Sequence, residues 1–332
     1  MRRQVSFILL LVSVVVLAWL CIFTGSVNIP ASEILKILFG GESSKSTWTN
    51  IILELRVPMT VTAALTGAAL GVSGLMLQTV FNNPLAGPSI LGISTGASLG
   101  VAIVLLALPG LSTPYAAAIF GAFIGAGFVL LLLLGFSAFV RSGLMLLIVG
   151  IMLSYITSSV ISVLNFYATQ EGVHSFVIWG MGNFSAVGKS SLPLYASVTV
   201  VMLVLSFLVV KPLNALLLGE HYASNVGVNI TLSRLAILFV SGVLIAVSTA
   251  FCGPIGFIGL AVPHIGRLIM QSSNHKILLP TVIVAGAATG LLTLWISSLP
   301  GSRGALPVNA ITPIIGVPVV LYIILNKKIR RG

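Results

Sequence analysis

Histidine and carboxylate side chains are the groups that could perform catalysis or hold a metal ion, and this sequence has few of them. Its 332 residues include four histidines and five acids. No two histidines have metal-ligand spacing, and no carboxylate has a second one placed for acid–base work. We therefore expect a chain that is not an enzyme and has no metal site. For His264, which follows Pro263, a structural hydrogen bond is the better interpretation.

Residues 183–190, with the sequence NFSAVGKS, match the phosphate-binding loop motif G-x-x-x-x-G-K-[ST] at every position except the first. The first glycine of that pattern is Asn183 here, and no β-strand is predicted before it. We expect no ATP binding at Lys189. If ATP is used, another chain must hydrolyse it.

Residues 217–229, with the sequence LLGEHYASNVGVN, form a polar segment between two long apolar runs. The segment includes Glu220, His221 and Asn225 and has the length of about one short helix. In so hydrophobic a chain, a stretch that leaves the membrane and returns is best explained by a partner that binds it. We predict that residues 212–230 are a cytoplasmic segment held by such a partner.

The elements that position these residues are apolar helices. The chain is 58% hydrophobic and 6% charged, with a mean hydropathy of +1.18, so it lacks the charged surface of a soluble protein. We predict an all-α polytopic membrane protein. The net charge of +11 is scattered over the ends of apolar runs and forms no basic stripe. Membrane lipid, and no nucleic acid, is therefore the expected partner of these charges.

About ten transmembrane helices are predicted from apolar runs near residues 5–25, 57–80, 89–108, 114–139, 143–166, 192–210, 232–251, 255–270, 277–298 and 307–326. Residues 26–55 are more polar and are expected to form an external loop with a short helix near 31–39. Of the 16 Lys and Arg residues, cytoplasmic N- and C-termini would place eleven inside and five outside, which favours this orientation.

Small residues recur at helical spacing within these runs, and lipid provides no hydrophobic drive that would bring helices together. Close backbone contact through the small residues is therefore the expected way in which the helices pack. The residues concerned are Ala63, Gly67, Gly71, Gly92, Gly96, Gly100, Gly121 and Gly125.

Four separated motifs resemble the permeases of ABC importers for iron-siderophores, haem and cobalamin, and the resemblance extends from about Arg56 to the C-terminus. The motifs are Asn83-Pro84-Leu85-Ala86 with Ile90-Leu91-Gly92, Leu218-Gly219-Glu220 with Val226-Gly227-Val228, Gly256-Phe257-Ile258-Gly259-Leu260 with Pro263-His264, and Leu306-Pro307-Val308 with Ile315-Gly316-Val317-Pro318.

The resemblance implies a type II ABC importer permease fold in the cell inner (plasma) membrane. It also implies a homodimer, or a pair with a sister permease, two cytoplasmic ATPase subunits, and a periplasmic or lipid-anchored substrate-binding protein. No cofactor is expected on this chain, and ATP with Mg²⁺ would bind the ATPase subunits. An iron chelate, either a siderophore complex or haem, is ranked before cobalamin as the substrate.

Site residues follow from the same resemblance. The residues expected to couple the chain to the ATPase are Gly219, Glu220, His221, Ala223, Val226 and Gly227. The residues expected to dock the binding protein are Arg56 and, by position only, Arg303; the second arginine of the family motif is Met59 here. The gate and pathway residues are Ser142, Gly143, Asn83, Pro84 and Asn309, the last of which replaces a family glycine.

The implied mechanism is alternating access driven by ATP hydrolysis on the partner subunits. No Asp, Glu, Lys or Arg lies in the middle of a predicted run, which fits a conduit that another protein drives. The alternative is a secondary carrier or channel that acts alone, and a membrane enzyme is a distant third. The polar segment separates the first two, because a lone carrier needs no cytoplasmic docking helix.

Overall fold

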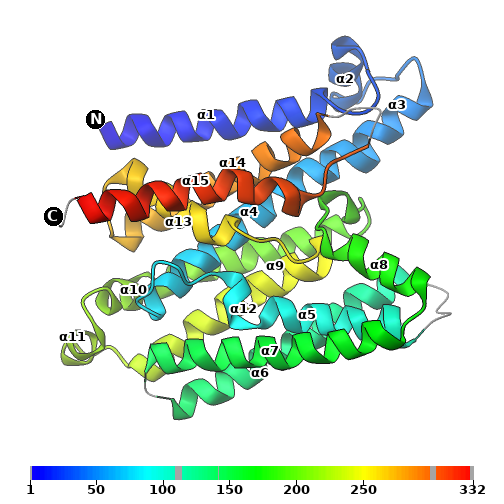
Figure 1. Ribbon diagram of the computed structural model, residues 1–332. Helices are drawn as coiled ribbons and strands as arrows, with labels where there is room; N and C mark the ends of the chain where they lie inside the picture. Colours follow the sequence, from blue (N-terminus) through cyan, green and yellow to red (C-terminus); the bar gives the residue numbers. More distant parts are fainter. Residues whose placement is uncertain (1, 109–113, 141, 300–303, 330–332) are drawn as a thin grey trace.

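The computed structural model describes residues 2–108, 114–140, 142–299 and 304–329, and helices are the only regular structure in these ranges (Figure 1). The α-helices are α1 (Arg2–Phe23), α2 (Ala31–Leu38), α3 (Ser46–Asn50), α4 (Val57–Val80), α5 (Ile93–Ala102), α6 (Pro114–Phe139), α7 (Gly143–Tyr167), α8 (Gln170–Gly180), α9 (Leu192–Leu205), α10 (Val210–Leu216), α11 (Glu220–Asn225), α12 (Ile230–Cys252), α13 (Ile258–Met270), α14 (His275–Ser298) and α15 (Val308–Ile329). The all-α prediction is confirmed.

Five shorter stretches join or extend these helices as π or 3₁₀ turns. They are η1 (Ile51–Arg56), η2 (Pro88–Leu91), η3 (Ile103–Ala107), η4 (Phe184–Ala186) and η5 (Ser206–Val209). Seven helical segments of the described chain are long and apolar enough to cross a membrane, and three shorter apolar helices accompany them, at Ile93–Ala107, Ile258–Met270 and Val308–Tyr322. Each apolar run predicted from the sequence therefore lies on one of these ten segments.

Helices α4 and α12 form the centre of the molecule. In their apolar windows 83% and 78% of the residues are buried, whereas only 6% are buried in α1. Helix α4 packs against α12, α13 and α14, and α1 lies along the outside of α14 (Figure 1). The outer helix α1 therefore exposes most of its apolar surface, as expected of a helix that faces lipid.

Close contact between backbones holds the central helices together, as the spacing of small residues predicts. A Cβ atom on Gly125 of α6 would lie 2.0 Å from the carbonyl oxygen of Gly96 on α5. On the other side of the core, a Cβ atom on Gly286 of α14 would lie 2.3 Å from the carbonyl oxygen of Gly67 on α4. No larger residue fits at such contacts, so tight packing explains these glycines.

Two helical segments lie outside the apolar runs predicted from the sequence. Residues 46–56 are helical and continue into α4, because Ile52 is fully buried and Glu54 pairs with Lys189 at 2.8 Å. Helix α8 follows Thr169, whose hydroxyl accepts a hydrogen bond from the Gly172 N–H at 3.2 Å. Both segments carry a charge or a polar run, so hydropathy alone did not reveal them. The short helix predicted near 31–39 is present as α2.

The polar turn after α2 is stabilised by Glu33. Its carboxylate accepts hydrogen bonds from the backbone N–H of Ser44 at 2.9 Å and from the Ser44 hydroxyl at 2.8 Å. The bond from the backbone N–H is the larger cause, and together the two bonds lower the pKa of this carboxyl below its ordinary value.

The contact between α5 and α6 can be tested with two neighbouring glycines of α6. We expect Gly125→Ala to lower the thermal unfolding midpoint, because forcing a methyl group into a packed contact costs about 1–3 kcal/mol. Gly127→Ala is the matched control, since nothing lies within 4 Å of its Cβ position. The midpoint can be followed in detergent with a thiol-reactive dye that reports exposure of the buried Cys21 and Cys252. Equal midpoints for the two variants would refute the packing argument.

Candidate functional site

The segment predicted to couple the chain to a partner forms α11, which projects from the helical bundle between α10 and α12 (Figure 1). Gly219 and Gly227 flank this helix with φ angles of +101° and +83°, and no atom lies within 4 Å of either Cβ position. Glycine is thus required here by the backbone conformation and not by a lack of space. The two residues set the path by which the chain leaves α10 and returns to α12.

One side of α11 is held by the protein and another faces outward. Ala223 is fully buried. Leu218, Tyr222 and Val226, spaced four residues apart, expose 64%, 49% and 54% of their surface. Tyr222 lies within α11, whereas Leu218 precedes Gly219 and Val226 directly follows the helix. Together these exposed side chains form an apolar stripe that suits contact with another protein. His221 is exposed as well.

Glu220 faces back into the chain and forms an ion pair. Its Oε1 atom accepts a hydrogen bond of 2.6 Å from the guanidinium of Arg234, on the first turns of α12. The Arg234 side chain is 5% exposed, and that of Glu220 is 39% exposed. The same guanidinium donates a bond of 2.9 Å to the carbonyl oxygen of Val140, directly after α6. Arg234 therefore connects α11 to the turn between α6 and α7.

A cavity of about 560 Å³ lies beside this ion pair. It is lined by Thr79, Val80, Phe81, Asn82, Ser142, Gly143, Leu144, Leu216, Gly219, Glu220 and His221. Three residues predicted for coupling and two predicted for the gate thus share one cavity, although more than 70 positions separate them in the sequence. Arg141, at the same turn, lies outside the described residues.

Gly143, the first residue of α7, contacts the end of α4 very closely. A Cβ atom there would lie 2.8 Å from the carbonyl oxygen of Val80. Ser142, the residue before it, is exposed at the cavity. The turn between α6 and α7 is therefore seated directly on the end of the central helix α4, and a larger residue at position 143 would push the two apart.

Asn83 and Pro84 lie in the turn that follows α4 but do not line the cavity. The side-chain oxygen of Asn83 accepts a hydrogen bond from the backbone N–H of Leu85 at 2.9 Å, which closes the turn. The carbonyl oxygen of Pro84 accepts a bond of 2.8 Å from Nε2 of His264 on α13. The structural hydrogen bond expected for His264 is confirmed, and it attaches the turn to α13.

A buried polar network at the ends of four helices was not foreseen from the sequence. Arg267 of α13 donates a hydrogen bond of 2.6 Å to Gln78 of α4. His275 of α14 lies 2.8 Å from the hydroxyl of Thr79 and 3.0 Å from the side-chain oxygen of Asn214 on α10. Since α10 leads into α11, this network attaches the base of the coupling segment to the core. Polar residues spaced far apart in sequence offered no motif by which to find it.

Asn309, in the first turn of α15, joins three segments. Figure 1 shows that α15 begins at the opposite end of the helices from α11. Its Nδ2 atom donates to the carbonyl oxygens of Gly180 at 3.0 Å and Pro254 at 2.6 Å, and its Oδ1 atom accepts from the N–H of Gly256 at 3.1 Å. The amide thus fixes the start of α15 to the end of α8 and to the turn before α13. Its predicted contribution to the pathway stays a prediction.

Arg56 lies at the junction of η1 and α4 with 7% of its surface exposed. Its guanidinium donates hydrogen bonds to the carbonyl oxygens of Ile22 at 2.7 Å, Phe23 at 3.3 Å and Val27. The residue is therefore engaged with the end of α1. A docking role for Arg56 would require this guanidinium to leave those carbonyls, and it remains untested. Arg303 lies outside the described residues.

The described part of the chain contains no group of three or more His, Cys, Asp or Glu side chains able to hold a metal ion. The stretch that resembles a phosphate-binding loop forms a 3₁₀ turn with Phe184 buried, and its Lys189 pairs with Glu54. These contacts give the stretch a structural role.

Replacing Arg56 separates the two roles considered for it. We expect Arg56→Gln to lower the thermal unfolding midpoint of the permease alone, since a hydrogen bond to a charged group contributes about 1.5–3 kcal/mol. Lys189→Gln is the control, because its pair with Glu54 is exposed and contributes about 0–1 kcal/mol. An unchanged midpoint for Arg56→Gln, together with weaker binding of an external protein, would instead favour the docking role.

Comparison with known proteins gives concordant results. The FecCD transport family matches residues 10–326. The hemin transport system permease protein HmuU of Yersinia pestis is 31% identical over 100% of this chain and 98% of its own length. The vitamin B12 import system permease protein BtuC of Klebsiella pneumoniae subsp. pneumoniae is 37% identical over 83% of each chain.

Solved structures agree. A metal-chelate type ABC transporter in an inward-facing conformation has a TM-score of 0.84 and 28% identity, covering 97% of this chain and 98% of its own. PsaBC from Streptococcus pneumoniae, in complex with Fab, has a TM-score of 0.55 and 16% identity, over 80% of this chain and 90% of its own, and shares the fold alone. The chain thus has the all-helical fold of an ABC transporter permease and belongs to the FecCD transport family.

Proposed function

We propose that this chain is the membrane-spanning subunit of an ATP-driven importer that carries an iron chelate, haem or cobalamin across the cell inner membrane. The observation that carries the proposal is the connection from α11 through Arg234 to the carbonyl oxygen of Val140, beside a cavity shared with Ser142 and Gly143. The named substrates of its relatives, hemin and vitamin B12, define the substrate class, and we rank an iron chelate first.

In this proposal the energy comes from separate cytoplasmic ATPase subunits. The exposed stripe of Leu218, Tyr222 and Val226 is the surface on which an ATPase subunit would sit. Glu220 is turned inward and would act on α12 rather than on the ATPase. The short helix between its two glycines would move as one rigid piece. The chain's N- and C-termini would lie on the same, cytoplasmic, side.

The movement would reach the gate by two routes. Arg234 joins α11 to the turn at Val140, which precedes Ser142 and Gly143. Asn214, on α10 before α11, joins α10 to His275 at the start of α14. A displacement of α11 would therefore shift the turn between α6 and α7 relative to α4, and so open or close the inner end of the path by alternating access.

A second permease subunit would complete the path. Helix α7 is only 17% buried in its apolar window, although it begins at the proposed gate. Its exposed apolar side chains include Met145, Met152 and Ile156, spaced at helical intervals. Such a face suits a second copy of this chain or a sister permease, with the substrate path between the two. A periplasmic or lipid-anchored binding protein would deliver the substrate at the opposite end.

Purification of the chain from its own membranes in mild detergent tests the partner. We expect an ATPase subunit in stoichiometric amount, and much less of it with Tyr222→Arg, which places a charge in the apolar stripe. Tyr322→Arg is a matched control, because Tyr322 is a similarly exposed tyrosine on α15. Substrate flux into liposomes without ATP and without a co-purified ATPase would contradict the proposal and favour a carrier that acts alone.

Substitution of the ion pair tests the coupling route. We expect Glu220→Gln and Arg234→Lys each to lower the substrate transported per ATP hydrolysed by about tenfold or more, because a hydrogen bond to a charged group contributes about 1.5–3 kcal/mol. Lysine keeps the charge but cannot donate to both Glu220 and the Val140 carbonyl in the same geometry. The ratio can be measured in proteoliposomes that contain the whole complex.

Glu42→Gln is the control for this experiment, since Glu42 is exposed and lies in the loop between α2 and α3. The double variant should lower the substrate transported per ATP hydrolysed no further than the more severe single variant does, because both substitutions break the same connection. A transport ratio equal to that of the unmodified chain in both single variants would refute the coupling route, even if the ATPase still co-purified.

A further inference from the structure

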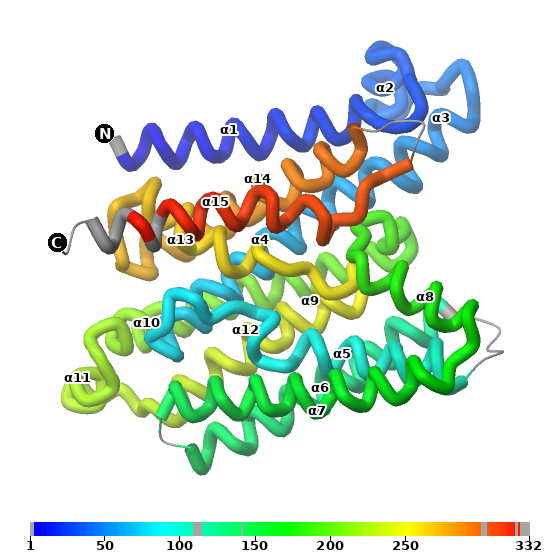
Figure 2. Tube along the Cα trace, in the orientation of Figure 1, coloured from blue at the N-terminus to red at the C-terminus, as the bar shows by residue number. Residues whose placement is uncertain are grey.

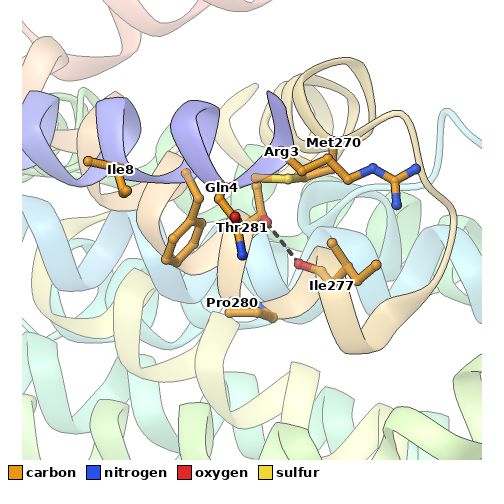
Figure 3. A pocket seen from close by; sticks show the side chains of 8 residues that line it. Arg3, Gln4, Ile8, Met270, Ile277, Pro280 and Thr281 are labelled. Atoms are coloured by element: carbon orange, nitrogen blue, oxygen red, sulfur yellow. Dashed lines mark hydrogen bonds between the residues drawn. The ribbon is translucent and has the colours of Figure 1, made fainter. Parts of the chain in front are cut away.

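An apolar groove of about 570 Å³ lies between the start of α1, the end of α13 and the first turns of α14 (Figure 3). Its walls are formed by Phe7 and Ile8 of α1, Met270 of α13, and Ile277 and Pro280 of α14. Among the described residues that line it, the polar side chains are those of Arg3, Gln4 and Thr281. The groove is remote from the cavity beside Glu220 and shares no residue with it.

The groove faces the apolar surroundings of the chain. Helix α1 is 6% buried in its apolar window, and Ile8 on the wall is 57% exposed. The hydroxyl of Thr281 donates to the carbonyl oxygen of Ile277 at 2.8 Å, as Figure 3 shows, so it presents no unpaired polar group to the groove. In a membrane-spanning protein, an apolar groove of this kind is filled by hydrocarbon in preference to water.

The mouth of the groove is positively charged. Arg3 lies there with an exposed side chain and donates one hydrogen bond, of 3.2 Å, to the carbonyl oxygen of Gln271. A guanidinium has five N–H donors, so donors remain for an anion. Lys276, next to Ile277 of the wall, is exposed as well. The sequences of α1, α13 and α14 contain no Asp or Glu, so no carboxylate on these helices offsets the charge.

Arg3 and Lys276 place this charge at one end of the helices that form the groove. Figure 2 shows the start of α1 and α13 on the same side of the molecule. Basic residues close to a membrane surface attract anionic lipid, at about 1 kcal/mol per residue. The groove therefore combines a hydrocarbon-lined wall with a cationic mouth at the end of its helices.

We propose that this groove binds one anionic phospholipid, with an acyl chain along Phe7, Ile8 and Ile277 and the phosphate at Arg3. The lipid would add a further connection between the start of α1 and the α13–α14 pair. This inference depends on the chain spanning a membrane and not on the substrate or the ATPase. Its failure would therefore leave the proposed function untouched.

The test is native mass spectrometry of the full chain, delipidated in detergent and then transferred to nanodiscs that contain phosphatidylglycerol or phosphatidylcholine. We expect one phosphatidylglycerol per chain to survive release from the nanodisc, and little phosphatidylcholine. Arg3→Gln should reduce the occupancy of phosphatidylglycerol about fivefold, which is the change expected for the loss of one basic residue. Lys36→Gln, on the exposed helix α2, is the control and should leave occupancy unchanged.

A second pair of variants tests the groove itself. Ile8→Trp should fill it and displace the lipid, whereas Val15→Trp, at an equally exposed position of α1 outside the groove, should not. Both positions face outward, so the fold tolerates either change. The proposal would be overturned if the two lipids were retained equally, or if Arg3→Gln left the occupancy of phosphatidylglycerol unchanged. It would also be overturned if Ile8→Trp dissociated a dimer of the chain without releasing lipid.

Discussion

The structure depends on one constraint, which is that helix backbones lie in direct contact at positions where only glycine fits. In a lipid bilayer the hydrophobic effect does not drive apolar side chains together, so helices associate through close packing of their backbones. Gly67 on α4 meets Gly286 on α14, and Gly96 on α5 meets Gly125 on α6, with no room for a Cβ atom at any of them. These contacts place α4 at the centre, and everything at its ends is positioned by that placement.

The last carbonyl groups of a helix have no hydrogen-bond partner within the helix. Two buried arginines of this chain donate hydrogen bonds to such groups. Arg56 donates to Ile22 and Phe23 in the last turn of α1, and Arg234 donates to Val140 just after α6. A cation at a helix C-terminus is also favoured by the helix dipole. In each case the arginine comes from the start of another helix, so a helix end is secured and two helices are joined by the same group.

The sequence was sufficient for the helices and insufficient for their connections. Long apolar runs and small residues at helical spacing predicted the main helices and their close packing, because both depend on local pattern. The bounds of α4 match the predicted run at residues 57–80, but the helical residues 46–55 before it were predicted as loop, because Glu54 is charged and its partner Lys189 is distant in sequence. Motif resemblance brought Glu220 and Gly143 to attention separately. Their shared cavity could not be predicted, because it depends on how α4 places distant turns side by side.

In the proposed mechanism, one side of helix α11 contacts the rest of the chain and the other side contacts the ATPase subunit. Glu220 is committed to Arg234 through a bond of 2.6 Å, and removing that carboxylate would leave a buried guanidinium without its counter-ion. Leu218 and Tyr222 face outward and carry no such commitment. In the proposed mechanism, a partner that presses on the outer side would displace the ion pair on the inner side, and with it the turn at Val140. One short helix would thus connect the surface that a partner contacts to the turn between α6 and α7.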